Sequence, residues 1–286
     1  MASTTLPDVS TRRQKAGIAP LEYTRRLWLQ LILAGSFVFL YFPIFALIAF
    51  SFNDSKRNIT WQGFTFDYYV KALTNSSLHE AALNTLIIAS ISTVVSTVLG
   101  AMIGLVLQRY RFPGKGGYDG LIHLPIVIPE VCLGVAMLAF FSAISMPLGI
   151  ATVTISHIAF SFPFVAVVVR ARMEGFDLAL EEASRDLGAS EWQTFWNVTF
   201  PYMVPGVVAG ALLAMTLSLD DFVITFFTSG PGSTTFPVKI YSMVRFSVTP
   251  EVNAASTILI VLTLALTVAA MMIQSRSDKK TKKANG

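Results

Sequence analysis

Residues 175–201 read GFDLALEEASRDLGASEWQTFWNVTFP, a polar insert between two apolar segments, Ile150 to Val169 and Tyr202 to Phe227. A helix of about 20 residues crosses a bilayer core of roughly 30 Å, and both flanking segments are long enough to do so. The insert therefore predicts a membrane protein with a structured element outside the bilayer, where a soluble motor protein can reach it.

The composition of the chain supports this interpretation. Of its 286 residues, 53% are hydrophobic and only 13% are charged, which is too apolar for a soluble protein of this size. The net charge of +4 does not indicate a nucleic-acid partner, because the Lys and Arg residues lie beside apolar runs. The single cysteine, Cys132, excludes an internal disulfide. His79, His123 and His157 lack metal-ligand spacing, so we expect packing residues and no metal site.

Six apolar segments are long enough to span a membrane, and no alternating strand pattern recurs. They run from Leu27 to Phe50, Leu83 to Leu107, Leu121 to Ile144, Ile150 to Val169, Tyr202 to Phe227 and Ala254 to Ile273. The sequence predicts an all-α membrane protein whose six transmembrane helices occupy residues 27–275. A polar segment, 1–26, precedes them, and a basic tail, 276–286, follows.

The basic residues predict the orientation of the helices. Of 21 Lys and Arg residues, 16 fall on the side that holds both termini and the insert. The positive-inside rule places that side in the cytoplasm. Residues 53–80 and 229–253 are then expected to face outward.

The insert itself predicts two short helices joined by a turn. Asp177 can cap a helix from Leu178 to Leu187, and Gly188 can end it in a left-handed conformation. Ser190 and Gln193 have the spacing of a capping box for a second helix.

Charges on the first predicted helix are spaced four residues apart. Glu181 and Arg185 stand in the favourable order for an ion pair, whereas Glu182 and Asp186 carry like charges. A cation from another subunit would relieve that repulsion. The alternative is a solvated amphipathic helix lying on the membrane surface.

One pattern in the insert has fixed spacing, and its residues are Glu182, Ala183, Ser184, Gly188, Val198 and Pro201. It resembles the EAA loop of bacterial ABC importer permeases, in which Glu-Ala-Ala precedes Gly, an aliphatic residue and Leu-Pro. Ser184 replaces the second alanine, and Phe200 replaces the leucine. The resemblance implies a type I ABC importer permease fold with a cytoplasmic coupling helix between the fourth and fifth transmembrane helices. The implied ATPase-coupling residues are Glu181, Glu182, Ala183, Arg185, Asp186, Gly188 and Pro201.

Three other stretches are similar to the second membrane subunit of spermidine/putrescine importers. They are Ser51-Phe52-Asn53 with Trp61-Gln62-Gly63-Phe64, Arg109-Tyr110-Arg111-Phe112, and Lys239 to Val244 with Pro250 to Ala254. The resemblance implies a subunit of the bacterial inner membrane that works with a related second permease, a homodimeric ATPase and a periplasmic binding protein for polyamines. It implies that ATP and Mg are bound by the ATPase and that this chain is no enzyme. Residues 112–117 indeed lack the full pattern of a phosphate-binding loop.

Ionisable residues inside apolar segments are costly and are candidates for function. Glu130 is expected roughly 14 Å along the third transmembrane helix, near the midplane of the membrane. Asp220 is expected roughly 28 Å along the fifth transmembrane helix, near the outer mouth of the pathway, with Asp221 beside it. Carboxylates at intervals with aromatic rings such as Tyr241 would suit a polyamine cation. Three alternatives remain open: Glu130 is neutral or bonded to His123, one aspartate caps a neighbouring helix, and Tyr241 only anchors its helix in the interface.

Two other functions compete with polyamine import. The first is an ABC importer permease for another small solute, and an anion importer should lack the acidic pathway. The second is a self-sufficient secondary transporter, which would need no ATPase. The docking insert and the absence of a visible internal repeat count against it.

Overall fold

The computed structural model describes residues 27–55, 60–246, 248–265 and 268. The predicted end segments, 1–26 and 276–286, lie outside these residues. The chain divides into two units, residues 1–49 and 50–286. The described part of the first unit is a single helix, α1 (Leu27–Phe50), which has a mean hydropathy of 2.4 and coincides with the first predicted transmembrane helix.

The second unit is also helical, and in its described part the β-structure amounts to one isolated bridge between Asn53 and Phe64. Its labelled helices are α2 (Asp67–Thr74), α3 (Ser76–Arg109), α4 (Lys115–Val127), α5 (Glu130–Ala143), α6 (Ile150–Met173), α7 (Ala179–Asp186), α8 (Glu191–Thr194), the π-helical turn η2 (Phe195–Thr199), α9 (Phe200–Asp220), α10 (Val223–Thr228) and α11 (Phe236–Phe246). A further helix covers Pro250–Ala265.

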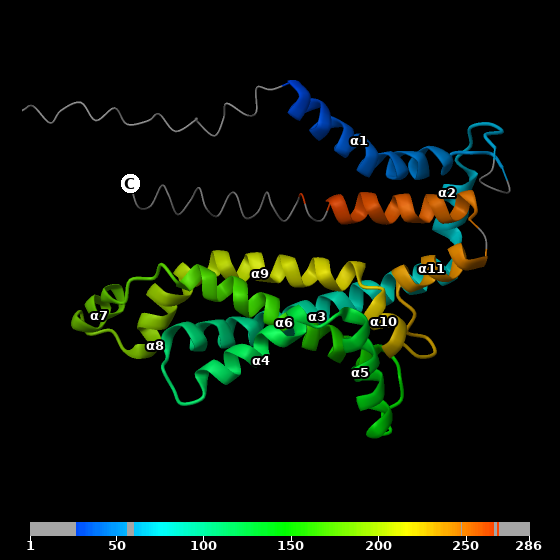
Figure 1. Ribbon diagram of the computed structural model, residues 1–286. Helices are drawn as coiled ribbons and strands as arrows, with labels where there is room; N and C mark the ends of the chain where they lie inside the picture. The colour runs from blue at the N-terminus through cyan, green and yellow to red at the C-terminus, as the bar shows by residue number, and fades with distance from the viewer. Residues whose placement is uncertain (1–26, 56–59, 247, 266–267, 269–286) are drawn as a thin grey trace, which may run out of the picture. The chain divides into compact units, whose positions relative to one another are not determined.

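Three long helices, α3, α6 and α9, form the core of this unit, as Figure 1 shows. Glycines allow them to approach closely. A Cβ added at Gly100 of α3 would lie 2.5 Å from the Cβ of Val165 on α6, and one at Gly210 of α9 would lie 2.8 Å from Val165 Cγ1. Gly100 and Gly104 of α3 therefore serve close contact with α6.

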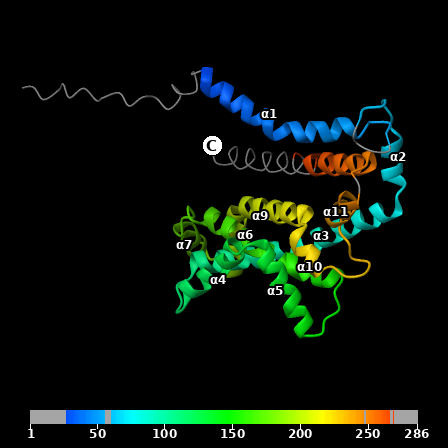
Figure 2. The ribbon, with the colours of Figure 1, turned by 45° about the vertical axis from the view of Figure 1, so that its right-hand side comes forward.

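The long helices of the second unit separate two groups of short ones. In Figures 1 and 2, α7 and α8 lie at one end of α3, α6 and α9, whereas α10 and α11 lie at the other end. The predicted insert and the predicted acidic mouth thus occupy opposite ends of the same helices.

Among the described residues, four helices are long and apolar enough to cross a membrane, and a bent pair raises the number to five. The four are α1, α3, α6 and the continuous stretch Glu191–Asp220. The last predicted transmembrane helix, Ala254 to Ile273, is described only as far as Ala265, apart from residue 268. The count of six therefore stays a prediction.

The third predicted transmembrane helix is not continuous. It breaks into α4 and α5, which meet at an angle of 107°. Ile128 is extended, with ψ 132°, and Pro129 follows it; the α region is disfavoured for a residue before proline. The continuous helix from which the depth of Glu130 was calculated is therefore wrong, since Glu130 is the first residue of a new helix.

The fifth predicted transmembrane helix also ends early. Helix α9 stops at Asp220, Asp221 is extended with ψ 122°, and α10 begins at Val223. The two neighbouring aspartates consequently belong to different local structures.

Candidate functional site

The insert folds as helix, turn and helix, as predicted. The Ala179 N–H donates to Asp177 Oδ1 at 2.9 Å at the start of α7, and Gly188 follows the helix with φ +86°. At α8, the Gln193 N–H donates to Ser190 Oγ at 3.3 Å and the Ser190 N–H donates to Gln193 Oε1 at 2.8 Å. The predicted capping box is confirmed.

One carboxylate attaches α7 to the rest of the bundle. Glu181 is only 2% exposed, and its Oε2 lies 2.6 Å from Nη2 of Arg109, the last residue of α3. Arg109 Nη1 also donates to Glu181 Oε1 at 3.0 Å, and Thr199 Oγ1 donates to the same oxygen at 2.5 Å. The predicted pairing of Glu181 with Arg185 is wrong, because Glu181 faces inward and Arg185 Nε donates instead to the Glu181 backbone carbonyl at 3.4 Å.

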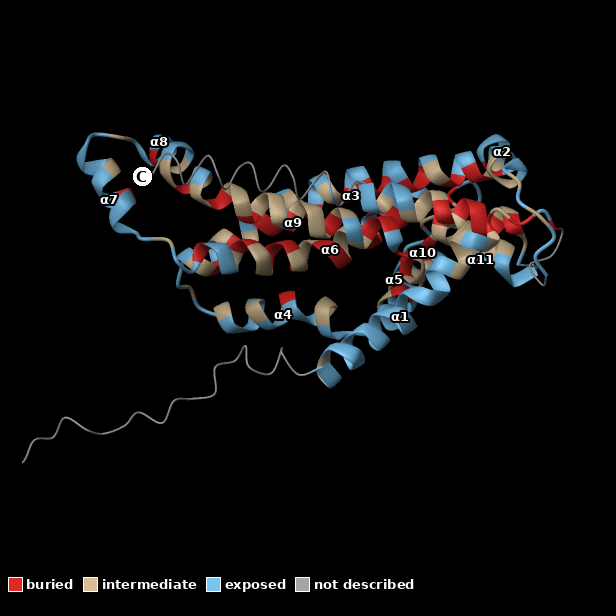
Figure 3. Cartoon of the chain, turned by 90° about the horizontal axis from the view of Figure 1, so that it is seen from above, coloured by how far each residue is buried: buried red, intermediate tan, exposed pale blue. Residues whose placement is uncertain are grey.

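The remaining surface of α7 is exposed, as Figure 3 shows. Glu182, Ala183 and Asp186 are all exposed, and the neighbouring Leu180 and Leu187 are 52% and 91% exposed. Apolar side chains on a short surface helix outside the apolar core are free to contact another protein.

Pro201 is the second residue of α9 and lies within the continuous helical stretch Glu191–Asp220. Immediately before α9, residues Phe195–Thr199 form the π-helical turn η2. Such turns are rare and occur frequently at functional sites. This turn leads directly from the insert into a long core helix.

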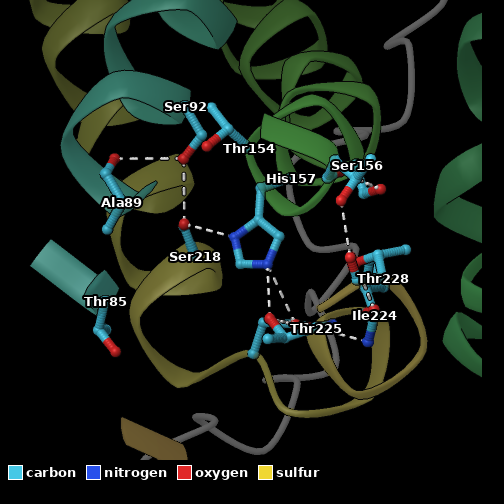
Figure 4. A network of polar contacts seen from close by, with 12 residues as sticks. Thr85, Ala89, Ser92, Thr154, Ser156, His157, Ser218, Ile224, Thr225 and Thr228 are labelled. Carbon is cyan, nitrogen blue, oxygen red and sulfur yellow. Dashed lines mark hydrogen bonds and ion pairs between the residues drawn. The ribbon is translucent and has the colours of Figure 1, made fainter. Parts of the chain in front are cut away.

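At the opposite end of the bundle, a buried polar network surrounds His157 of α6 (Figure 4). His157 is 2% exposed, and its Nδ1 lies 2.7 Å from Ser218 Oγ of α9. Its Nε2 lies 2.9 Å from Thr225 Oγ1 of α10 and 3.2 Å from Asp221 Oδ2. Ser218 in turn lies 3.0 Å from Ser92 Oγ of α3. The network therefore joins four helices.

Asp221 belongs to this network and also caps α10. Its oxygens accept from the Thr225 N–H at 2.8 Å, the Thr225 hydroxyl at 2.7 Å and the Ile224 N–H at 3.2 Å. The alternative that one aspartate caps a neighbouring helix is confirmed for Asp221, which is 8% exposed. Asp220, by contrast, is exposed at the end of α9.

Glu130 comes into the same region from a distant part of the sequence. It is exposed at the start of α5, and α5 packs against α10, the short helix that follows Asp220 and Asp221. Helix α5 approaches α10 at Gly134, where an added Cβ would lie 2.8 Å from Phe227 Cδ2. The sequence showed these acids separately, and the fold brings them together.

The other predicted contacts of this end are partly corrected. His123 does not bond to Glu130; its Nδ1 lies 2.7 Å from the Asp119 carbonyl oxygen. His79 and His123 are exposed rather than packed, and only His157 is a satisfied buried histidine. Tyr241 of α11 is 46% exposed, and its ring centroid lies 4.6 Å from that of Phe222, next to Asp221.

The sequence reasoning missed several residues of these clusters. Arg109 was used for orientation and for the resemblance but was given no contact. Thr199, Ser218 and Thr225 were not singled out, and His157 was assigned to packing alone. One local signal was available: Asp is a preferred capping residue at the start of a helix, and Asp221 stands just before a short apolar run. Among the described residues, no three His, Cys, Asp or Glu side chains are grouped to hold a metal ion.

The chain matches the family described as binding-protein-dependent transport system inner membrane component over residues 17–283. It is 40% identical over 243 residues to the spermidine/putrescine transport system permease protein PotC of Escherichia coli K12, covering 85% of this chain and 92% of PotC. It is 36% identical over 267 residues to the putrescine transport system permease protein PotI of the same strain, covering 91% and 95%.

Solved structures show the same fold. A bacterial ABC transporter involved in the import of the acidic polysaccharide alginate matches with a TM-score of 0.69 at 18% identity, covering 90% of this chain and 97% of the other. The MetNI methionine ABC transporter matches with a TM-score of 0.60 at 20% identity, covering 70% and 95%. With the family match and the two permease relatives, these findings confirm the resemblance noted in the insert. The chain belongs to the family of inner membrane components of binding-protein-dependent transport systems and is the permease subunit of an ABC importer.

Proposed function

We propose that this permease carries polyamines of the spermidine and putrescine class into the bacterial cytoplasm. The observation that carries the proposal is the similarity, over most of the chain, to permeases named for spermidine and putrescine transport.

The acids at the α10 end of the bundle support a cationic substrate. Glu130 and Asp220 are exposed carboxylates at helix ends, and the half-exposed ring of Tyr241 lies near Phe222. Carboxylates can replace the water around protonated amines, and an aromatic face can stabilise a cation between them. Asp221 has a different part in this proposal, because its oxygens are already engaged by His157, Ile224 and Thr225. We assign substrate contact to Glu130 and Asp220 and assign Asp221 to holding the site.

The exposed face of α7 would dock onto a homodimeric ATPase, which would bind ATP and Mg. Glu182 and Asp186 are exposed like charges four residues apart, and a cation of the ATPase would relieve their repulsion. Leu187, at 91% exposure, would add apolar contact. Closure of the ATPase would then tilt the bundle between outward-open and inward-open packings.

The remaining partners follow from the same proposal. A related second permease would complete the pathway, and a periplasmic binding protein would deliver the polyamine. The protein would lie in the bacterial inner membrane with both termini in the cytoplasm, as the distribution of basic residues predicts.

Uptake of radiolabelled spermidine and putrescine tests the proposal. Cells that lack this subunit would be complemented with the wild type, Glu182→Ala or the matched control Glu174→Ala, whose exposed carboxylate precedes the insert. We expect the wild type and the control to restore uptake and Glu182→Ala to fail at equal membrane levels. If the wild type restores nothing while an ATPase still copurifies, the polyamine assignment falls, and an importer of another small solute takes its place.

A further inference from the structure

Helix α7 is held to the bundle by a charged contact rather than by apolar packing. Within α7 the buried residue is Glu181, whereas Leu180 of α7 and Leu187, which directly follows the helix, are more than half exposed. The hydrophobic effect, which fastens most surface helices, therefore contributes little to the position of α7. The hydrogen bonds and ion pair of the Glu181 carboxylate hold α7 in position instead.

Glu181 connects the insert to two different long helices. Arg109, at the end of α3, lies 2.6 Å from one carboxylate oxygen, and Thr199, immediately before α9, donates to the other at 2.5 Å. A hydrogen-bonded ion pair has a defined direction, unlike an apolar contact that allows sliding. A displacement of α7 is therefore passed to α3 and α9 together.

Part of this cluster is open to water. The Arg109 side chain is 31% exposed, and it borders a cavity of about 530 Å³ that is also lined by Arg185, Glu191 and Trp192. Without Arg109, the Glu181 carboxylate would have water within reach if α7 moved outward. Loss of the ion pair should therefore release α7 and spare the bundle core.

We propose that Glu181, Arg109 and Thr199 form a positioning cluster that makes α7, α3 and α9 move as one body when the ATPase closes. This inference rests on the proposed coupling function of α7. It assigns force transmission to these three residues and ATPase contact to Glu182 and its exposed neighbours.

The purified importer in liposomes tests the inference through the number of spermidine molecules taken up per ATP hydrolysed. We expect Glu181→Gln and Arg109→Met to lower this ratio about fivefold or more, while the ATPase still copurifies and hydrolyses ATP. Arg109→Lys, which keeps the charge, should recover part of the ratio. The matched control is Arg111→Met, which removes an exposed arginine two residues away.

A distance measurement separates transmission from a general structural role. In a background with Cys132→Ser, spin labels at Ala179→Cys on α7 and Gln108→Cys on α3 report the distance between the two helices. We expect one narrow distance distribution with and without ATP in the otherwise unchanged chain. Glu181→Gln should broaden it, because α7 is then no longer fixed to α3.

The outcomes are distinct. An unchanged transport ratio with a narrow distance distribution in Glu181→Gln and Arg109→Met overturns the inference. Loss of ATPase copurification in these variants also overturns it, because the cluster would then serve docking. If the importer with the unsubstituted permease hydrolyses ATP but does not transport spermidine, the proposed substrate is contradicted. The distance measurement then still decides the role of the cluster.

Discussion

The two polar clusters of this permease lie at opposite ends of the same long helices and differ in access to water. At the insert, Glu181 is 2% exposed but its partner Arg109 is 31% exposed, so water reaches one side of the pair. At the other end, His157 and Asp221 have side chains that are 2% and 3% exposed, enclosed by four helices. A polar contact near water can open and reform at modest cost, because water replaces the lost partner, whereas an enclosed polar contact cannot. The first suits a moving joint, and the second suits a fixed one.

The largest effect is expected from a substitution that disrupts the enclosed network around His157. In His157→Leu, Asp221 keeps its bonds to α10 but loses the imidazole, and Ser218 loses a partner. Removing one partner of a buried pair costs about 3 kcal/mol or more. We expect the free energy of unfolding of the purified protein in detergent to fall by that amount, with His123→Leu at an exposed site as the control. If the free energy of unfolding falls no more in His157→Leu than in His123→Leu, the enclosed cluster does not stabilise the bundle more than the exposed one does.

The next effect separates the two neighbouring aspartates. Asp221→Asn places an amide where three donors converge and should lower the free energy of unfolding by about 1–3 kcal/mol. Asp220→Asn is exposed and should leave stability unchanged while it lowers spermidine uptake. Thermal unfolding and uptake measured on the same pair check this, and the opposite pattern would exchange the two roles.

A smaller effect is expected at the insert. Ser190→Ala removes the capping hydrogen bond of α8, which is worth about 1 kcal/mol. Because this cap stands outside the core, we expect hydrogen exchange to accelerate at residues 190–194 and to stay unchanged around His157. Acceleration at both sites would show that the insert and the core unfold together.

The smallest effect on stability is expected at Leu187. Because this side chain is 91% exposed, Leu187→Ser should change the free energy of unfolding by no more than about 0.5 kcal/mol. The same change should reduce copurification of the ATPase, since it removes apolar contact from the exposed face of α7. Normal copurification would place the docking surface elsewhere on the insert.

Local patterns in the sequence predicted local structure well. The end of α7 at Gly188, the capping box at Ser190 and the course of α3 and α6 all follow from the chemistry of a few neighbouring residues. The bend before Glu130 could have been predicted from Pro129. The prediction of one continuous helix relied on the hydrophobicity of the segment alone.

Contacts between distant residues were beyond a single sequence. Arg109 and Glu181 are 72 residues apart, and local spacing favoured Arg185 as the partner of Glu181. Only the packing of α3 beside the insert decides between the two arginines. The same holds for His157 and Asp221, which meet because α6 and α10 are neighbours.

The π-helical turn before α9 sets the rotational phase of that helix. A π-helical turn contains about one residue more than an α-helical turn. If Phe195–Thr199 were α-helical instead, every side chain of α9 would be rotated by about 100° around the helix axis. Gly206 and Gly210 would then leave the face where an added Cβ would lie 2.7 Å from Arg172 Cβ and 2.8 Å from Val165 Cγ1. Five residues outside the helix thus determine which of its sides can meet α6.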